Sequence, residues 1–323
     1  MVKVEHLVKF YGEKEVLSDV SFSIREGEVV GLLGLNGAGK STTMNILTGY
    51  LSATSGSVSI DGHDILADAN GAKRSIGYLP ELFAFYPEMR VNEYLSFCCD
   101  LKGVTRNKKE REEHLSAICE RVGLAQVRGR MIRNLSKGYK QRVGFAQALV
   151  GNPKVLILDE PTVGLDPSQI IEIRELIRSA GKSSTVIVSS HILSEIQAIC
   201  DRVIVIHGGR VAADDTPESL SRKMLATHRL VMRVKGEPER VTAVLSQVPG
   251  VLKVTRLTEK EPGAYDYRVD GEPNTDIRTD VFHALARADL PLLCTYNNEL
   301  SLEDVFLNLV GEPCGEQKGG DRA

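Results

Sequence analysis

Hydrophobic and polar positions alternate with a period of two over residues 2–30, around the pair Tyr11-Gly12. This alternation predicts antiparallel strands with one buried face. Residues 29–33 are continuously apolar and are followed by glycine, which is typical of a parallel strand buried on both faces. Residues 57–60 predict another strand, closed by the turn pair Asp61-Gly62.

The middle of the chain alternates between helical and strand patterns. Hydrophobic positions recur with helical periodicity from about residue 92 to 149, where the charged patch at 108–113 is expected to be a solvated helix face. Two short apolar runs follow, at 155–158 and 186–188, on either side of a helical stretch over 169–179. This alternation predicts an α/β core.

The pattern changes again near residue 225, where we expect a second, smaller domain. Its predicted elements form two strand-helix-strand units, at 229–234, 240–248, 251–257, 265–269, 279–288 and 291–296. Two such units in tandem predict a ferredoxin-like α+β fold. We therefore expect one domain at 1–224 and another at 225–310, the latter ending in an amphipathic segment at 301–310 that packs onto a neighbour. The glycine-rich, charged tail at 311–323 is expected to be disordered.

The composition narrows the kind of protein. Hydrophobic residues make up 42% of the 323 positions and charged residues 26%, as in globular proteins. The net charge of −3 gives no reason to expect a nucleic-acid partner. Six cysteines without Cys-x-x-Cys spacing are expected to be reduced thiols in a cytosolic protein. No stretch approaches the roughly 20 apolar residues that cross a bilayer. Any membrane role is therefore expected to come from a partner.

A glycine-rich loop lies directly between the apolar strand at 29–33 and a predicted helix. It fits the P-loop pattern, in which backbone N–H groups turn toward anionic oxygens and the following helix adds its positive end. Its lysine can reach the β- and γ-phosphates of a nucleotide, and the next hydroxyl can bind Mg²⁺. By itself the loop leaves kinase, GTPase and motor functions open. The predicted nucleotide-binding residues are Gly34, Leu35, Asn36, Gly37, Ala38, Gly39, Lys40, Ser41 and Thr42.

Two carboxylates follow the apolar strand at 155–158. The carboxyl end of a buried parallel strand is where open α/β sheets bind ligands. Asp159 is predicted to hold Mg²⁺ through water, since Mg²⁺ keeps much of its hydration shell. Glu160 is predicted to face the attacking water as general base. The alternative, an ordinary acidic strand end, is disfavoured by the P-loop in the same chain.

The loop at 135–141, Leu-Ser-Lys-Gly-Tyr-Lys-Gln, precedes a helical run, so Ser136 is predicted to be a helix N-cap. With the P-loop and the carboxylate pair, this loop resembles the signature loop of the ATP-binding cassette (ABC) family, and the resemblance covers roughly residues 2–220. It implies a P-loop NTPase fold of ABC type, with antiparallel β and helical subdomains. It also implies contact with the γ-phosphate held by a second subunit's P-loop, through Ser136, Lys137, Gly138 and Tyr139.

Three further residues match the family's pattern. Asp166 matches the loop that crosses the dimer interface, and His191 matches the switch histidine that senses the γ-phosphate. Tyr11 matches the aromatic residue that stacks on adenine, although a surface tyrosine before a turn is the alternative. The resemblance thus implies catalytic roles for Lys40, Glu160 and His191.

Three positions depart from the family's commonest pattern. Lys137 and Tyr139 stand where glycine and glutamine are usual, but Ser136 and Gly138 are kept, so binding is expected to survive. Glu81 stands where the family usually has a glutamine that contacts Mg²⁺ and moves with the membrane partner. We expect Ser41, Glu81 and Asp159 to be the Mg²⁺ ligands.

Glutamate at position 81 resembles exporters of the ABC-2 type, as does the ending Leu-Glu-Asp-Val-Phe at 302–306. The resemblance implies an ATPase that dimerises around two ATP·Mg²⁺, with itself or a paralogue. It would drive a separate polytopic permease from the inner face of the cell membrane. Alternatives are an ABC ATPase acting in DNA repair or on ribosomes, or a nucleotide-dependent regulatory module. The first is disfavoured because no sustained heptads and only one P-loop occur.

Overall fold

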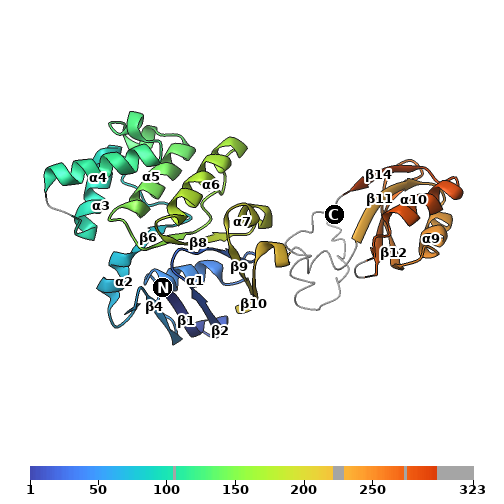
Figure 1. Ribbon diagram of the computed structural model, residues 1–323, viewed down its shortest axis with the longest axis horizontal. Helices are drawn as coiled ribbons and strands as arrows, with labels where there is room; N and C mark the ends of the chain where they lie inside the picture. Colours follow the sequence, from blue (N-terminus) through green and yellow to red (C-terminus); the bar gives the residue numbers. More distant parts are fainter. Residues whose placement is uncertain (105–106, 221–228, 273–274, 297–323) are drawn as a thin grey trace. The chain divides into compact units, whose positions relative to one another are not determined.

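The computed structural model describes residues 1–104, 107–220, 229–272 and 275–296. Contacts divide the chain into two compact units, Met1–Pro217 and Glu218–Ala323 (Figure 1). The sequence placed the boundary at residue 224, within a stretch that lies outside the described residues. The predicted amphipathic segment at 301–310 and the tail at 311–323 also lie outside them.

An antiparallel sheet of four strands, in the order β2-β1-β4-β5, forms one layer of the first unit. Its bounds are β1 Val2–Tyr11, β2 Lys14–Ile24, β4 Ser55–Ile60 and β5 His63–Asp64. Tyr11 pairs with Lys14 across a tight turn whose Gly12 has a φ of 60°, a conformation that favours glycine. The alternating pattern at 2–30 therefore forms the predicted hairpin.

A six-stranded sheet, in the order β10-β9-β3-β8-β7-β6, forms the second layer. Its strands are parallel except for β10, which pairs antiparallel with β9. The apolar runs are continuous because both faces of the central strands are buried. The bounds are β3 Val29–Leu33, β6 Ile76–Leu79, β7 Val155–Leu158, β8 Thr185–Ser190, β9 Arg202–His207 and β10 Arg210–Asp215.

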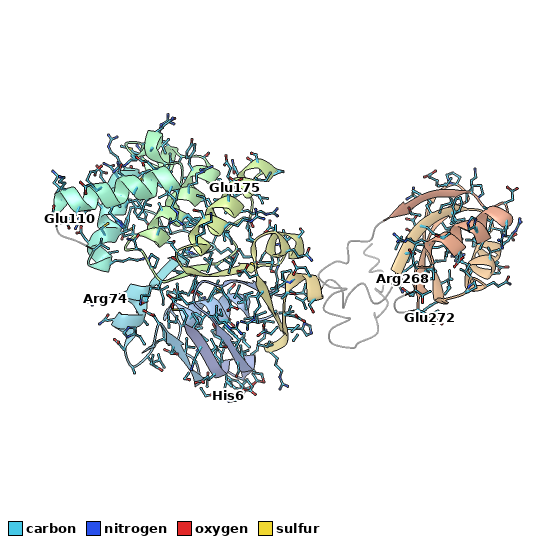
Figure 2. The ribbon with its side chains drawn as sticks, in the orientation of Figure 1. His6, Arg74, Glu110, Glu175, Arg268 and Glu272 are labelled. Atoms are coloured by element: carbon cyan, nitrogen blue, oxygen red, sulfur yellow. The ribbon has the colours of Figure 1, made fainter. Side chains whose placement is uncertain are left out.

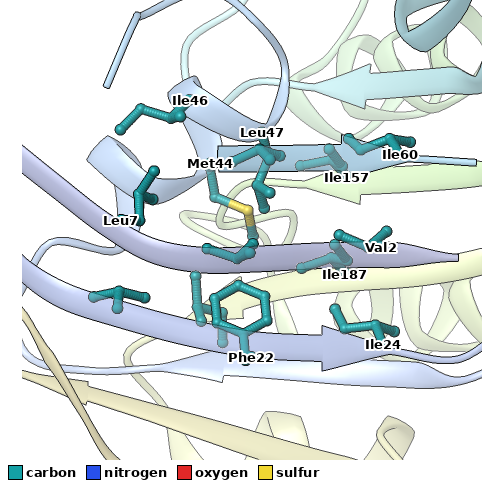
Figure 3. Packing of buried hydrophobic residues seen from close by; sticks show 14 of the residues in the cluster. Val2, Leu7, Phe22, Ile24, Met44, Ile46, Leu47, Ile60, Ile157 and Ile187 are labelled. Carbon is teal, nitrogen blue, oxygen red and sulfur yellow. The ribbon is translucent and has the colours of Figure 1, made fainter. Parts of the chain in front are cut away.

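One hydrophobic core joins the two sheets and helix α1 (Lys40–Leu47) (Figure 3). Phe22 of β2 and Met44 of α1 belong to this cluster, and so do Ile157 and Ile187 from the central strands. All four are at most 8% exposed. Because β7 and β8 are packed by this core, the residues that follow them are held in position at the carboxyl edge of the sheet.

The other helices of the first unit are α2 Ala69–Ser75, α3 Val91–Lys102, α4 Lys108–Arg121, α5 Lys137–Leu149, α6 Pro167–Gly181 and α7 Leu193–Ile199. The helical pattern at 92–149 thus becomes α3, α4 and α5, with two short 3-10 turns before α5. Glu110 on α4 and Glu175 on α6 are exposed and carry charge on the surface (Figure 2). Five of the six charged residues at 108–113 are exposed, which confirms the expected solvated face, and the sixth, Arg111, is half-buried and pairs with Asp100.

The described part of the second unit is a four-stranded antiparallel sheet, in the order β12-β13-β11-β14, with two helices. The chain runs β11 Arg229–Lys235, α9 Pro238–Ser246, β12 Val251–Glu261, β13 Ala264–Gly271, α10 Arg278–Arg287 and β14 Leu292–Tyr296. Met232, Tyr267 and Leu285 lie in its own core. This order is the predicted ferredoxin-like topology.

Among the described residues, no helix is long and apolar enough to span a bilayer. The five described cysteines are free thiols.

Candidate active site

The glycine-rich loop connects β3 to α1 and has the backbone of a phosphate cradle. Gly37 and Gly39 have φ values of 83° and 110°, which L side chains rarely adopt. Gly39 is also the N-cap of α1 and has no side chain to accept from the first N–H groups of the helix. These N–H groups can therefore bind an anion, and the helix dipole adds to the attraction.

Lys40 is 5% exposed, and its ammonium group lies within the loop. Nζ donates to the carbonyl oxygens of Gly34 at 2.6 Å and Leu35 at 3.3 Å. Burial lowers the pKa of Lys40, while the nearby carboxylates of Glu160, Asp159 and Glu81 oppose that shift. The carboxylates thus favour the charged form of Lys40, and an ammonium group within such a loop can bind a polyphosphate.

Asp159 and Glu160 follow β7 and are both buried, at 4% and 8% exposure. Asp159 Oδ1 accepts from the Ser189 hydroxyl at 2.5 Å, and that same hydroxyl accepts from the Glu160 backbone N–H at 2.8 Å. Burial raises the pKa of Asp159, with further contributions from the charges of Glu160 and Glu81. A cation at this position would therefore be favourable.

The Glu160 carboxylate lies between two cationic or ionisable side chains. Oε1 is 3.8 Å from Lys40 Nζ, and Oε2 is 3.0 Å from Nδ1 of His191. His191 directly follows β8, which pairs with β7 in the sheet. Three side chains from widely separated positions in the sequence thus meet at the carboxyl edge of adjacent strands.

These side chains border a pocket of about 370 Å³, which we call the nucleotide pocket. Glu81 lines it, as do residues of the predicted P-loop. Val16 and Val163 line it too, and neither was predicted. The lining residues from the P-loop are Leu35, Asn36, Gly37, Gly39, Lys40, Ser41 and Thr42.

Tyr11 does not line the nucleotide pocket. It ends β1, is 49% exposed, and has Lys9 Nζ at 5.2 Å from its ring centroid. Its stacking on adenine stays a prediction.

The signature loop also lies outside the pocket, since none of Ser136, Lys137, Gly138 and Tyr139 lines it. Ser136 is the N-cap of α5, as predicted, and its Oγ accepts from the Tyr139 N–H at 3.4 Å. Asp166 is the N-cap of α6 and accepts from Gln169 N–H at 2.9 Å. Hydrogen bonds from Ser168 and Gln169 lower the pKa of Asp166. Both polar loops therefore have a capping function within the chain.

The unusual Lys137 packs on the loop that contains Asp166. A methyl group added at Gly164 would lie 1.9 Å from Lys137 Nζ, and Gly164 has a φ of 70°. In the same region the side chain of Gln169 lies where a side chain at Gly138 would be. The lysine thus fills the space above Gly164 and joins two loops that are distant in the sequence.

Three supporting residues were not predicted. Ser189 joins the two carboxylates, and Gln141 donates from Nε2 to the Pro161 carbonyl oxygen at 2.5 Å. Glu195 accepts from Thr162 Oγ1 at 2.6 Å and from Ser190 Oγ at 3.1 Å. The sequence did offer a signal for Ser189, because two serines end the apolar strand β8 and the carboxyl ends of such strands are where ligands bind. Nothing in the local sequence around Gln141 or Glu195 indicated these contacts.

Comparison with known proteins identifies the family. Residues 17–163 match the family model described as ABC transporter. The chain is 34% identical over 310 residues to the Bacillus subtilis protein "Uncharacterized ABC transporter ATP-binding protein YxlF", covering 96% of this chain and 99% of that protein. The chain belongs to the ABC transporter family.

Two more similarities show which parts of this ABC protein are shared. It is 32% identical over 314 residues to "Linearmycin resistance ATP-binding protein LnrL" of Bacillus subtilis, covering 96% of this chain and 98% of that protein. It also resembles the solved dimeric post-hydrolysis state of the ATP-binding cassette MJ0796 bound to ADP and Pi, with 28% identity and a TM-score of 0.61. That structure covers 67% of this chain and is itself covered over 99% of its length.

The chain is therefore an ABC ATPase, a family that binds ATP with Mg²⁺. The donor groups around the pocket fit this ion, because Mg²⁺ prefers hard oxygen ligands. No cluster of three or more His, Cys, Asp or Glu side chains that could hold a metal occurs among the described residues. Such a cluster is not required, since Mg²⁺ in nucleotide sites is held by one or two carboxylates together with phosphate oxygens.

Proposed function

We propose that two copies of this ABC ATPase, or one copy and a paralogue, close around two ATP·Mg²⁺ and drive a separate membrane permease. One observation carries the catalytic part of this proposal: the Glu160 carboxylate lies between Lys40 and His191 at the edge of the nucleotide pocket. A carboxylate in that position can orient and deprotonate water next to a group that binds the γ-phosphate.

Each side chain then has a distinct role. The P-loop N–H groups and Lys40 bind the phosphates, and the cation balances charge that develops on the transferred group. Ser41, Asp159 and Glu81 would hold Mg²⁺, which supplies further charge neutralisation. His191 contacts the γ-phosphate and keeps the Glu160 carboxylate in place. Tyr11, which is exposed at the end of β1, would stack on adenine.

The position of the signature loop supports closure between two copies. Ser136, Lys137 and Tyr139 are exposed on the surface and do not line their own chain's pocket. A loop that binds a γ-phosphate must lie next to a bound nucleotide. These residues would therefore contact the nucleotide in the pocket of a second subunit. Asp166 lies on the neighbouring loop and would take part in the same interface.

The assignment of a permease partner and of a direction of transport is based on the similarity to named relatives. A protein whose name gives linearmycin resistance matches this chain over 96% of its length, including the second unit. Resistance by an ABC protein is consistent with export, so we assign an ABC-2 type exporter that acts at the inner face of the cell membrane. The permease would contact the region near Glu81 and the helices between residues 92 and 149.

The test of catalysis is Glu160→Gln. Turnover is expected to fall by about 100-fold or more, because a general base contributes at least that much. ATP binding should persist, since Lys40 and the P-loop are untouched. Steady-state ATPase assays and nucleotide titration of the purified protein measure both quantities. Near-normal hydrolysis by this variant would contradict the assignment of Glu160.

The test of transport is capture of the Glu160→Gln variant with ATP and Mg²⁺ from native membranes, followed by mass spectrometry. A stoichiometric polytopic membrane protein is the expected result. Recovery of only ribosomal or DNA-associated proteins would mean that the ATPase drives another machine. ATP-driven association of the chain with itself, without turnover in wild-type protein, would indicate a regulatory module.

A further inference from the structure

Glu195 is a buried carboxylate that the catalytic roles proposed above do not use. It lies in the first turn of α7 and is 6% exposed. One of its oxygens, Oε2, accepts hydrogen bonds from two buried hydroxyls, Thr162 Oγ1 at 2.6 Å and Ser190 Oγ at 3.1 Å. Burying a charge is unfavourable unless hydrogen bonds replace the lost water. The two hydroxyls therefore take the place of water around this carboxylate.

The first of these hydroxyls belongs to the turn that follows the predicted general base. Thr162 is two residues after Glu160, and the next residue, Val163, lines the nucleotide pocket. Backbone hydrogen bonds close this turn, from the Val163 N–H to the Glu160 carbonyl oxygen at 3.3 Å and from the Leu165 N–H to the Thr162 carbonyl oxygen at 3.2 Å. A bond that holds the Thr162 side chain therefore also restrains the backbone next to Glu160.

The second hydroxyl lies next to His191. Ser190 directly precedes His191 and is 1% exposed. Its oxygen accepts from the Ile192 N–H at 3.0 Å, while its hydroxyl donates to Glu195. These bonds restrain the backbone on both sides of His191, whose own side chain is 41% exposed. The position of this partly exposed ring thus depends on the backbone that carries it.

Backbone pairing between β7 and β8 does not extend to these two loops. The ladder ends at the pair of Leu158 with Val188, before either loop begins. On its other side β8 stays in register with β3 as far as Ser190, so that residue remains anchored in the sheet. Through its two hydrogen bonds, Glu195 connects the anchored Ser190 to Thr162.

We propose that Glu195 is a positioning residue for ATP hydrolysis. By accepting both hydrogen bonds through one oxygen, it fixes the turn after Glu160 relative to the backbone of His191 and so maintains the 3.0 Å contact between their side chains. The inference rests on the proposed function, because it assumes that these two side chains act in hydrolysis. Glu195 does not line the nucleotide pocket, so it acts through them and not on the nucleotide.

The first experiment compares the steady-state ATPase kinetics of the full chain with those of two variants. Glu195→Ala should lower kcat about tenfold or more, because small displacements of catalytic groups are costly. The KM for ATP should change by less than about twofold, since the P-loop and Lys40 bind the phosphates without Glu195. Glu195→Gln should retain about a third of the wild-type kcat or more, because its amide oxygen can accept the same two hydrogen bonds.

Three results of this experiment would overturn the proposal. They are an unchanged kcat in the alanine variant, a rise in KM as large as the fall in kcat, and a glutamine variant as impaired as the alanine variant. Asp266→Ala is the matched control, because Asp266 is a carboxylate of similar burial, at 8% exposure, in β13 of the second unit. A loss of kcat as large in this control would show that kcat responds to the loss of any buried carboxylate, which would also overturn the proposal.

A milder pair of variants keeps the test valid if Glu195→Ala fails to fold. Thr162→Val keeps the shape of the side chain and removes the hydroxyl, whereas Thr162→Ser keeps the hydroxyl. The valine variant should lose about threefold or more in kcat, and the serine variant should remain close to wild type. Equal activity of the two variants would contradict the proposed link.

A double-mutant cycle with His191→Ala identifies the group through which Glu195 acts. In that background Glu195→Ala should lower kcat by less than about a further twofold, because the contact that it maintains is already lost. Losses that multiply would mean that Glu195 acts elsewhere, and the inference would fail while the roles of Glu160 and His191 stand. A kcat near wild type in His191→Ala alone would contradict the proposed role of His191, and this inference would fail with it.

Discussion

At the scale of single residues, buried hydrogen bonds hold Asp159 and Glu160, the two carboxylates that follow β7. Ser189 is fully buried and bridges Asp159 to the backbone of Glu160. Glu160 has a φ of 48°, a conformation that non-glycine residues adopt at a cost, so its surroundings must hold it there. The buried hydroxyl is one of the groups that do so.

Replacing Ser189 with alanine is therefore expected to destabilise the protein. Two buried polar groups would lose their partner, at about 1–3 kcal/mol for each. Ser184→Ala is the matched control, because Ser184 is a buried serine that donates one bond, to Pro153 O at 2.8 Å. Chemical denaturation of both variants measures the difference. An equal loss of unfolding free energy in the two variants would show that the Ser189 bridge contributes no more than a single buried hydrogen bond.

The contact between Lys137 and Gly164 gives a second prediction at this scale. Gly164→Ala should destabilise the protein for two reasons: the left-handed backbone costs about 1–2 kcal/mol for an L-residue, and the new methyl group meets the lysine. Lys137→Ala in the same chain should recover only the part that is due to the clash. A double-mutant cycle on the free energy of unfolding separates the two contributions. Full additivity would mean that the residues are not coupled.

At the scale of elements, Lys102 joins the start of β6 to the end of α5 through the carbonyls of Ile76 and Val150. Burial lowers its pKa from 10.5 to about 8 in the folded protein. Above pH 8 the folded state has released this proton while the unfolded chain still holds it. The free energy of unfolding therefore rises with pH between these two pKa values. Below pH 8 both states hold the proton, so the folded protein bears the whole cost of burying the charged ammonium group.

Comparison of wild type with Lys102→Met isolates this effect. The difference in unfolding free energy should shift in favour of wild type from about pH 8 to about pH 10.5, by at most about 1.4 kcal/mol per pH unit. Cys98, Cys99 and His114 also interact with Lys102, but they are present in both proteins and largely cancel. Denaturation at a series of pH values provides the measurement. A difference that stays constant with pH would contradict the lowered pKa.

At the scale of the whole molecule, the two units have separate cores. Every residue that lines the nucleotide pocket lies between Val16 and His191. Solved ABC cassettes of similar fold cover 67–77% of this chain, whereas two relatives match over 96% of it and so share the second unit as well.

A chain that ends at Pro217 should therefore fold and bind ATP. Its core is complete without the second unit, and ligand binding should raise its melting temperature as it does for the full chain. Differential scanning calorimetry with and without ATP and Mg²⁺ tests this expectation. Aggregation of the shortened chain, or loss of the ATP-dependent shift, would show that the second unit supports the cassette.

Much of the fold and of the site follows from local sequence. The hairpin at Tyr11-Gly12, the apolar strands and the ferredoxin-like order each depend on periodicity over a few residues, and the structure has all of them. The P-loop and the pair Asp159-Glu160 are contiguous motifs whose chemistry requires neighbours in the chain. Ser136 and Asp166 could be assigned as N-caps because capping acts within three residues.

The remaining features depend on contacts between residues that are far apart in the chain. The bond from Ser189 to Asp159, the contact of Lys137 with Gly164 and the two carbonyl partners of Lys102 join different elements. No local pattern encodes such pairs, because they arise only when two elements pack in a given register. By itself the sequence predicted which groups carry the chemistry. Tertiary structure decided which of them meet, since burial and distance belong to the packed chain.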